Sequence, residues 1–206
     1  MKRLVILVLA AALLLVGCGT DNREYDEDEV KIAAARLIKQ SQELNDIFWG
    51  TGIAYIEDGG YKNGYYYPAD PVALRDLGYE TVEDILVETA KVFSAAYTES
   101  IAASVFSAKV GDYSMMGYTR YYQEIDVIMV YTIYEPLLKD EVEYMYDQIT
   151  VLGSEAEKVI VEIPIKVTRG ELSQTRSITV DLVEEENGWR IDSPTYASYR
   201  EKEVPK

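Results

Sequence analysis

The sequence has no histidine and a single cysteine, Cys18, among its 206 residues. Without histidine there is no Ser-His-Asp or Cys-His catalysis, no histidine general base and no zinc site of the usual nitrogen and sulfur kind. A lone cysteine also excludes a disulfide within the chain. We therefore predict a protein that is not an enzyme, that holds no metal or cofactor, and that is stabilised by its core.

Basic side chains are scarce as well. The chain has 20 Lys and Arg against 36 Asp and Glu, which gives a formal net charge of −16. Phosphate binding needs a basic surface, so this balance argues against nucleic acid and anionic lipid headgroups as partners of the folded part. An acidic surface instead favours a basic protein or a cation.

Two basic residues at the N-terminus precede an unbroken apolar run over residues 4–16, an order typical of a secretory signal peptide. The run is shorter than the about 20 residues that a membrane-spanning helix needs. The residues Leu15-Val16-Gly17-Cys18 resemble the lipobox of bacterial lipoproteins. That resemblance implies that residues 1–17 are removed as a signal peptide and that the Cys18 thiol carries lipid. The alternative is an ordinary secretory signal followed by an incidental cysteine.

Lipidation at Cys18 predicts a membrane anchor on the extracytoplasmic face of the bacterial cell, because two acyl chains hold a protein durably to a bilayer. Residues 18–29 are polar and acidic with no hydrophobic period, and we interpret them as a lipidated acidic tether that reaches roughly 40 Å when extended. A calcium loop at YDEDE is the competing interpretation, but the ligand spacing and central glycine of an EF-hand are missing. Removal of residues 1–17 would leave 18 basic and 36 acidic side chains, a balance of −18.

Apolar residues at helical spacing predict three helices. The first covers residues 30–49 and ends at Gly50 and Gly52. The second begins at Thr81-Val82-Glu83-Asp84, which has the form of a capping box. The third covers residues 95–108.

Strand-like patterns follow the helices and also interrupt them. Short strands are expected at 53–57 and 65–67, joined by a glycine-rich turn, and a central strand covered on both faces at 124–134. Residues 142–152 alternate with a phase change near Asp147, which suggests a bulge. Further strands are expected at 159–167, 177–183 and 188–192, and Pro164 argues for a sheet edge or a bulge at its position.

Helices first and antiparallel strands later predict an α+β fold, in which N-terminal helices pack on a curved antiparallel sheet of about four to six strands. We expect a single domain over residues 30–199 and a C-terminal tail at 200–206. The ending NGWRIDSPTY, residues 187–196, resembles the closing strand of NTF2-like and cystatin-like domains.

The run from Tyr61 to Pro68, the segment TVEDILVETAKVFSAAYTESI, and the strands DQITVL and VIVEIPI together resemble the cell-envelope proteins that inhibit peptidoglycan DL-endopeptidases. The resemblance implies a protein that acts on another protein. In that case the partner would be a cell-wall hydrolase.

Four tyrosines, Tyr61, Tyr65, Tyr66 and Tyr67, lie in the glycine-rich turn segment and are the predicted partner-binding residues. Tyrosine combines a large apolar face with a hydroxyl group, which suits it to protein or sugar contacts. The alternative is that some of them pack in the core. The apolar pattern of EIDVIMV predicts that Asp126 is buried, which makes it a candidate general base in the manner of the steroid isomerases that share the NTF2-like fold. The alternative is that this residue marks the end of a strand, as single acidic residues near strand ends more often do.

The leading functional hypothesis is a non-enzymatic, lipid-anchored envelope protein that binds a basic protein partner and inhibits a peptidoglycan DL-endopeptidase. The alternative is a receptor for a small molecule or peptidoglycan fragment, with an NTF2-like pocket between the helices and the sheet. An open pocket lined by tyrosine and an acidic residue would favour the receptor.

Overall fold

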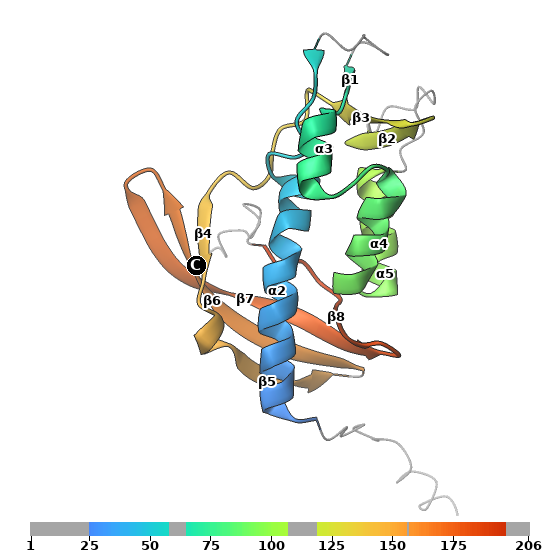
Figure 1. Ribbon diagram of the computed structural model, residues 1–206. Helices are drawn as coiled ribbons and strands as arrows, with labels where there is room; N and C mark the ends of the chain where they lie inside the picture. Colours follow the sequence, from blue (N-terminus) through green and yellow to red (C-terminus); the bar gives the residue numbers. More distant parts are fainter. Residues whose placement is uncertain (1–24, 58–64, 107–118, 156, 197–206) are drawn as a thin grey trace, which may run out of the picture.

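The computed structural model describes residues 25–57, 65–106, 119–155 and 157–196 (Figure 1). The helices are α2 (Glu27–Trp49), α3 (Pro71–Leu77), α4 (Val82–Val92) and α5 (Ala95–Val105), and a 3₁₀ turn, η2, covers Tyr146–Gln148. The strands are β1 (Tyr66–Pro68), β2 (Tyr121–Glu124), β3 (Val127–Tyr131), β4 (Glu141–Tyr144), β5 (Thr150–Glu155), β6 (Lys158–Arg169), β7 (Leu172–Glu185) and β8 (Gly188–Ile191).

Helix α2 begins at Glu27, three residues before the predicted start. The Asp26 carboxylate accepts hydrogen bonds from the backbone N–H groups of Asp28, at 2.9 Å, and Glu29, at 3.3 Å, and so caps the helix. Acidic side chains in a first turn are also favoured by the helix dipole. The last three residues assigned to the tether therefore belong to the helix.

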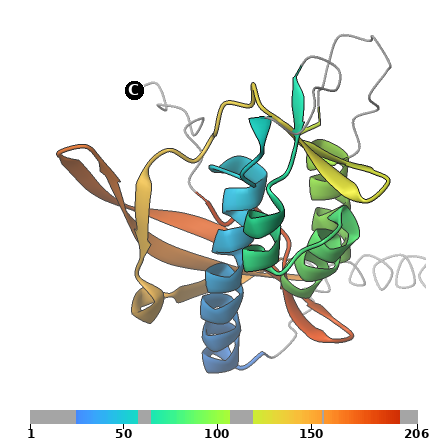
Figure 2. The same ribbon diagram turned by 45° about the horizontal axis from the view of Figure 1, so that its top comes forward.

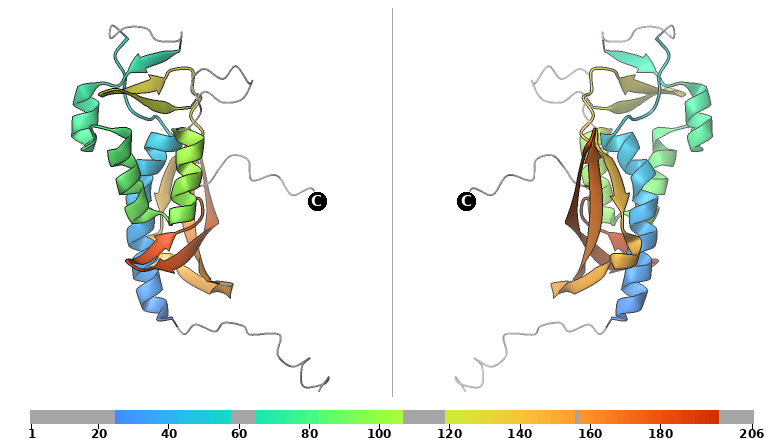
Figure 3. Two further views of the ribbon diagram at one scale, coloured as in Figure 1. Left: turned by 90° about the vertical axis from the view of Figure 1, so that its right-hand side faces the viewer. Right: turned by 90° about the vertical axis from the view of Figure 1, so that its left-hand side faces the viewer.

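The main sheet has five antiparallel strands in the order β4-β6-β7-β8, with β5 pairing with β6 beyond the end of β4. Figure 3 shows the curled sheet with the helices gathered on one side of it. Inward side chains of β6 and β7 are buried, among them Val161, Ile163 and Val180. They pack with the apolar face of α2, for which Leu37 and Phe48 are typical. The predicted α+β fold, with N-terminal helices on a curved sheet of four to six strands, is confirmed.

Pro164 lies in β6, which is a central strand and not the predicted edge. Its carbonyl accepts the N–H of Met145 at 3.0 Å, so its missing N–H would point to the same side, where η2 separates β4 from β5. No ladder hydrogen bond is therefore lost. The phase change near Asp147 is this 3₁₀ turn, and the bulge lies further on, between Val151 and Gly153.

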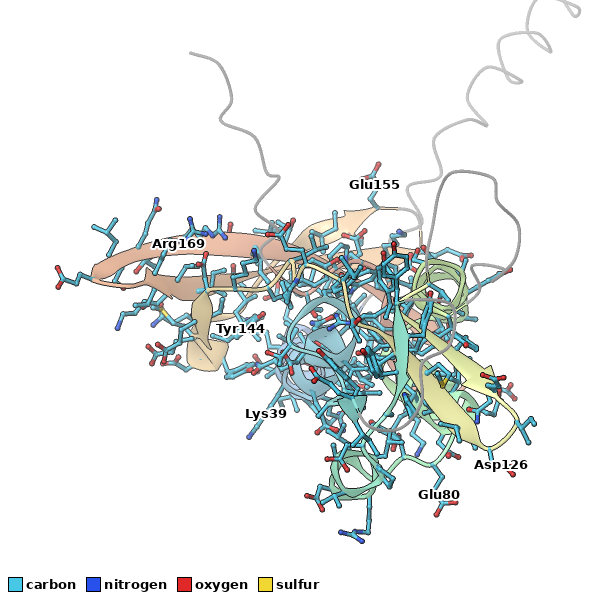
Figure 4. All side chains as sticks on the ribbon, turned by 90° about the horizontal axis from the view of Figure 1, so that it is seen from above. Lys39, Glu80, Asp126, Tyr144, Glu155 and Arg169 are labelled. Atoms are coloured by element: carbon cyan, nitrogen blue, oxygen red, sulfur yellow. The ribbon has the colours of Figure 1, made fainter. Side chains whose placement is uncertain are left out.

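The predicted central strand at 124–134 is wrong. Residues 121–131 form the hairpin β2–β3, whose turn consists of Ile125 and Asp126. Ile125 has a φ of 53° and is 88% exposed. Figure 4 shows Asp126 at the outer end of this hairpin, and its side chain is exposed, so it lacks the buried position expected of the candidate general base.

A second sheet, which the sequence reading did not separate from the first, has the order β1-β3-β2. It lies at the end of the molecule opposite to the start of α2 (Figure 1). The predicted strand at 53–57 is reduced to an isolated bridge between Tyr55 and Ala69. The turn expected after it falls at residues 58–64, outside the described residues.

Helices α4 and α5 confirm the predicted second and third helices. Thr81 and Asp84 form the expected capping box, with the Asp84 backbone N–H 3.1 Å from the Thr81 hydroxyl. Helix α3 was not predicted, although Asp70 caps it, Pro71 begins it and Gly78 ends it in the left-handed conformation. No helix among the residues that the structure describes is both long and apolar enough to cross a membrane.

Candidate functional site

The four predicted tyrosines have different environments. Tyr66 is fully buried, and its hydroxyl donates to the carbonyl of Thr119 at 2.6 Å, so it is a core residue and the prediction that it contacts a partner is wrong. Tyr65 is 40% exposed and Tyr67 is half-buried. Tyr61 and the lipidation residue Cys18 lie outside the described residues.

Tyr65 and Tyr67 lie on one face of the β1 segment because alternate residues of an extended chain point the same way. Tyr55, 39% exposed, stacks on Tyr67 with ring centroids 5.5 Å apart. We call Tyr55, Tyr65 and Tyr67 the tyrosine patch. The sequence reading missed Tyr55, although it lies in the strand-like run that was expected to accompany residues 65–67.

Backbone pairing holds Tyr55 against β1. The N–H of Ile56 donates to the carbonyl of Pro68 at 2.9 Å, and the N–H of Asp70 donates to the carbonyl of Ala54 at 2.8 Å. Ile53, just before, is anchored by its N–H to the Tyr121 hydroxyl at 3.0 Å. The patch thus rests on a fixed backbone.

A buried arginine supports the same region. Arg120 is 5% exposed, its Nη2 donates to the carbonyl of Gly50 at 2.7 Å, and its guanidinium carbon lies 4.1 Å from the centroid of the Tyr134 ring. The carbonyl end of α2 carries partial negative charge, and the ring face attracts cations, so both compensate the buried charge. Nη1 of Arg120 is buried without a hydrogen-bond partner.

A second candidate site is an open pocket of about 200 Å³ between the C-terminal half of α2, residues 137–140 and the concave face of the sheet. Figure 2 shows the long β6–β7 hairpin extending past α2 at this end. Arg176, Tyr144 and Tyr196 are among the residues that line it, together with the carboxylates of Asp46 and Asp140. Sequence reasoning anticipated a pocket between helices and sheet but named none of these residues.

An ion-pair network ties the sheet to the helices without forming a further site. The Lys158 ammonium lies 2.7 Å from the Asp192 carboxylate and 3.4 Å from that of Asp181, and Asp192 also accepts from the Ser94 hydroxyl. Burial acts to raise the pKa of Asp192, but the hydrogen bonds from Lys158 and Ser94 outweigh it and hold that pKa below its usual value. Ser94 also caps α5, so the network fixes this helix to the end of β8.

Comparison with known protein families and with curated proteins finds no match for this chain. The resemblances to NTF2-like domains and to endopeptidase inhibitors therefore stay predictions.

Buried tyrosines give a prediction for alkaline pH. Burial and the carboxylates of Glu43 and Glu88 raise the pKa of Tyr79 to about 12, and burial and Tyr146 raise the pKa of Tyr144 to about 12. In the unfolded chain tyrosine ionises near pH ~10. The stabilising contribution of both groups is thus complete below pH ~10 and is lost as the pH rises toward ~12, by at most about 1.4 kcal/mol per tyrosine per pH unit.

Urea unfolding across this pH range, followed by circular dichroism, measures the loss. Tyr79→Phe should make the decline shallower, because one of the tyrosines with a raised pKa no longer titrates. A free energy of unfolding that stays constant between pH ~9 and ~11 would contradict the assignment.

Proposed function

We propose that this chain is a lipid-anchored, non-enzymatic protein of the bacterial envelope that binds a basic protein partner through the tyrosine patch. The observation that carries the proposal is the exposure of aromatic side chains, Tyr55 at 39% and Tyr65 at 40%, with Tyr55 stacked on Tyr67, on a backbone held by hydrogen bonds. Exposed tyrosines on a rigid support are typical anchors of protein interfaces, because they bury a large area with little loss of rotamer freedom.

The position of the patch suits a tethered protein. Helix α2 has 23 residues and is therefore about 35 Å long. It starts next to the segment that leads to Cys18, whereas β1 lies at the opposite end of the molecule (Figure 1). A lipid on Cys18 would leave the patch facing away from the membrane.

The charge of the chain sets the expected class of partner. A formal net charge of −16 attracts basic surfaces, raises the rate of association with them and makes this rate fall with salt. In line with the resemblance noted in the sequence, the partner we propose is a peptidoglycan DL-endopeptidase, which the bound protein would inhibit.

Titration of the purified chain against a purified DL-endopeptidase with a basic surface tests the proposal. We expect inhibition at saturating protein and association that slows as salt is added. Tyr65→Ala should weaken binding by at least about tenfold. The matched control is Leu172→Ala, because Leu172 is 77% exposed at the end of the β6–β7 hairpin, away from the patch.

Two results would count against the proposal. Unchanged hydrolase activity at saturating protein excludes inhibition. Equal losses of affinity in the Tyr65→Ala and Leu172→Ala variants would exclude the tyrosine patch as the contact surface.

A further inference from the structure

Neighbouring residues on strands β4, β6 and β7 of the main sheet form one wall of the pocket beside α2. Tyr144 of β4 lies opposite Ile165 of β6, and Ile165 lies opposite Arg176 of β7. Residues directly opposite in antiparallel strands share a face, and Ile165 is fully buried on the concave side. Arg176 is therefore directed to the concave side, where the pocket is. Figure 4 shows Tyr144 between the strands and the helix, on this side of the sheet.

The other charged groups that line the pocket already have partners. Asp140 accepts two hydrogen bonds from Arg169, from Nε at 2.8 Å and from Nη2 at 3.1 Å. Asp46 accepts the backbone N–H of Thr51 at 2.9 Å. The Lys139 ammonium lies 2.6 Å from the Glu135 carboxylate.

Arg176 differs from these groups. Its Nε is buried and has no hydrogen-bond partner, and within the described parts of the chain no carboxylate pairs with its guanidinium. A buried donor without a partner is unfavourable, and more so when the group is charged. An anion beside the guanidinium would balance its charge.

We propose that the pocket binds a small carboxylate-bearing molecule, with Arg176 as the anchor of the carboxylate. A guanidinium offers two parallel N–H donors that match the two oxygens of a carboxylate. The remaining lining includes Leu138, Val142 and Val167, so the rest of the ligand is small and apolar. The volume of about 200 Å³ is below that of pockets for drug-sized molecules and fits a group the size of an acylated amino acid or the end of a peptide.

Charge favours a carboxylate over a phosphate. Asp46 and Asp140 line the same pocket, and the whole chain carries −16. Their repulsion is stronger for a dianion than for a single negative charge. A monoanion that also has an apolar part satisfies Arg176 at the lowest electrostatic cost.

The test is a titration of the full chain with N-acetylalanine, with its uncharged amide and with inorganic phosphate, followed by backbone amide shifts in NMR spectra. We expect N-acetylalanine to shift the amides of Asn45, Leu138 and Arg176, with the amide and phosphate binding at least about tenfold more weakly. Arg176→Gln should weaken N-acetylalanine binding by about tenfold or more. Arg36→Gln, which removes the same charge from the exposed face of α2, should leave it unchanged.

Several outcomes overturn the inference. The absence of amide shifts at the pocket would exclude a carboxylate site, and so would equal shifts with N-acetylalanine and its amide. Both outcomes are measured on the unchanged chain, so they do not depend on whether the Arg176→Gln variant folds. Preferential binding of phosphate would assign the pocket to another class of anion and would also contradict the carboxylate proposal. Tyr65→Ala should not affect this binding, so the pocket and the tyrosine patch stand or fall separately.

Discussion

Tyr66→Ala is expected to destabilise the domain by about 3–5 kcal/mol, the range for truncating a large buried aromatic side chain. Tyr66 has no exposed surface, and its ring lies 4.9 Å from that of Tyr122 and 5.3 Å from that of Tyr131, measured between centroids. Its hydroxyl also satisfies the buried carbonyl of Thr119. Urea unfolding at neutral pH measures the change.

The neighbouring tyrosine provides the control. Tyr65→Ala should cost less than about 1 kcal/mol, because substitutions at exposed positions are usually nearly neutral. Tyr66→Phe keeps the ring but leaves the Thr119 carbonyl without its donor, which should cost about 1–3 kcal/mol. Similar losses in Tyr65→Ala and Tyr66→Ala would show that Tyr66 is not a core residue. Partner binding should show the reverse order, with Tyr65→Ala the more harmful change.

The tyrosine cluster marks a limit of sequence reasoning. A run of three tyrosines has no apolar and polar alternation from which the buried member could be picked. Only the pairing of β1 with β3 places Tyr66 under the sheet and leaves Tyr65 accessible. The division of this segment into core and surface depends on tertiary contacts.

The β2–β3 hairpin was missed for a local reason. Two-residue hairpin turns usually carry Asn-Gly or another glycine pair, because their residues need positive φ. Here the turn is Ile125-Asp126, and a β-branched residue rarely adopts a φ of 53°. A continuous apolar pattern with no turn residue reads as one long strand.

The position of Arg176 on the concave face could have been predicted from the sequence. Ile178 and Val180 of β7 point inward, and alternate residues of a strand share a face. Arg176, two residues before Ile178, is therefore a charged residue at an inward position. A charged residue at an inward position is the pattern of a pocket or an ion pair. By contrast, Pro164 predicted a sheet edge or a bulge, but it lies in the central strand β6, beside the gap that η2 makes between β4 and β5.

Gly52→Ala is expected to destabilise the domain by about 4 kcal/mol, well beyond the cost of backbone strain alone. Gly52 has a φ of 81°, and a Cβ there would collide with the Arg120 guanidinium and the Tyr121 hydroxyl. Both groups hold the end of α2: Arg120 donates to the carbonyl of Gly50, and Tyr121 donates to that of Ile47. A side chain at Gly52 would displace both buried donors from these carbonyls.

Gly78→Ala separates the cost of backbone strain from the cost of the steric collision at Gly52. Gly78 has a φ of 80°, but a Cβ there would meet nothing within 4 Å. Its substitution should cost only the strain of the left-handed conformation, about 1–2 kcal/mol. Chemical unfolding of both variants measures the difference, and equal losses would mean that the close approach of Arg120 and Tyr121 to Gly52 does not contribute. Because the same two side chains anchor the segment that carries Tyr55, Gly52→Ala should also weaken partner binding, whereas Gly78→Ala should not.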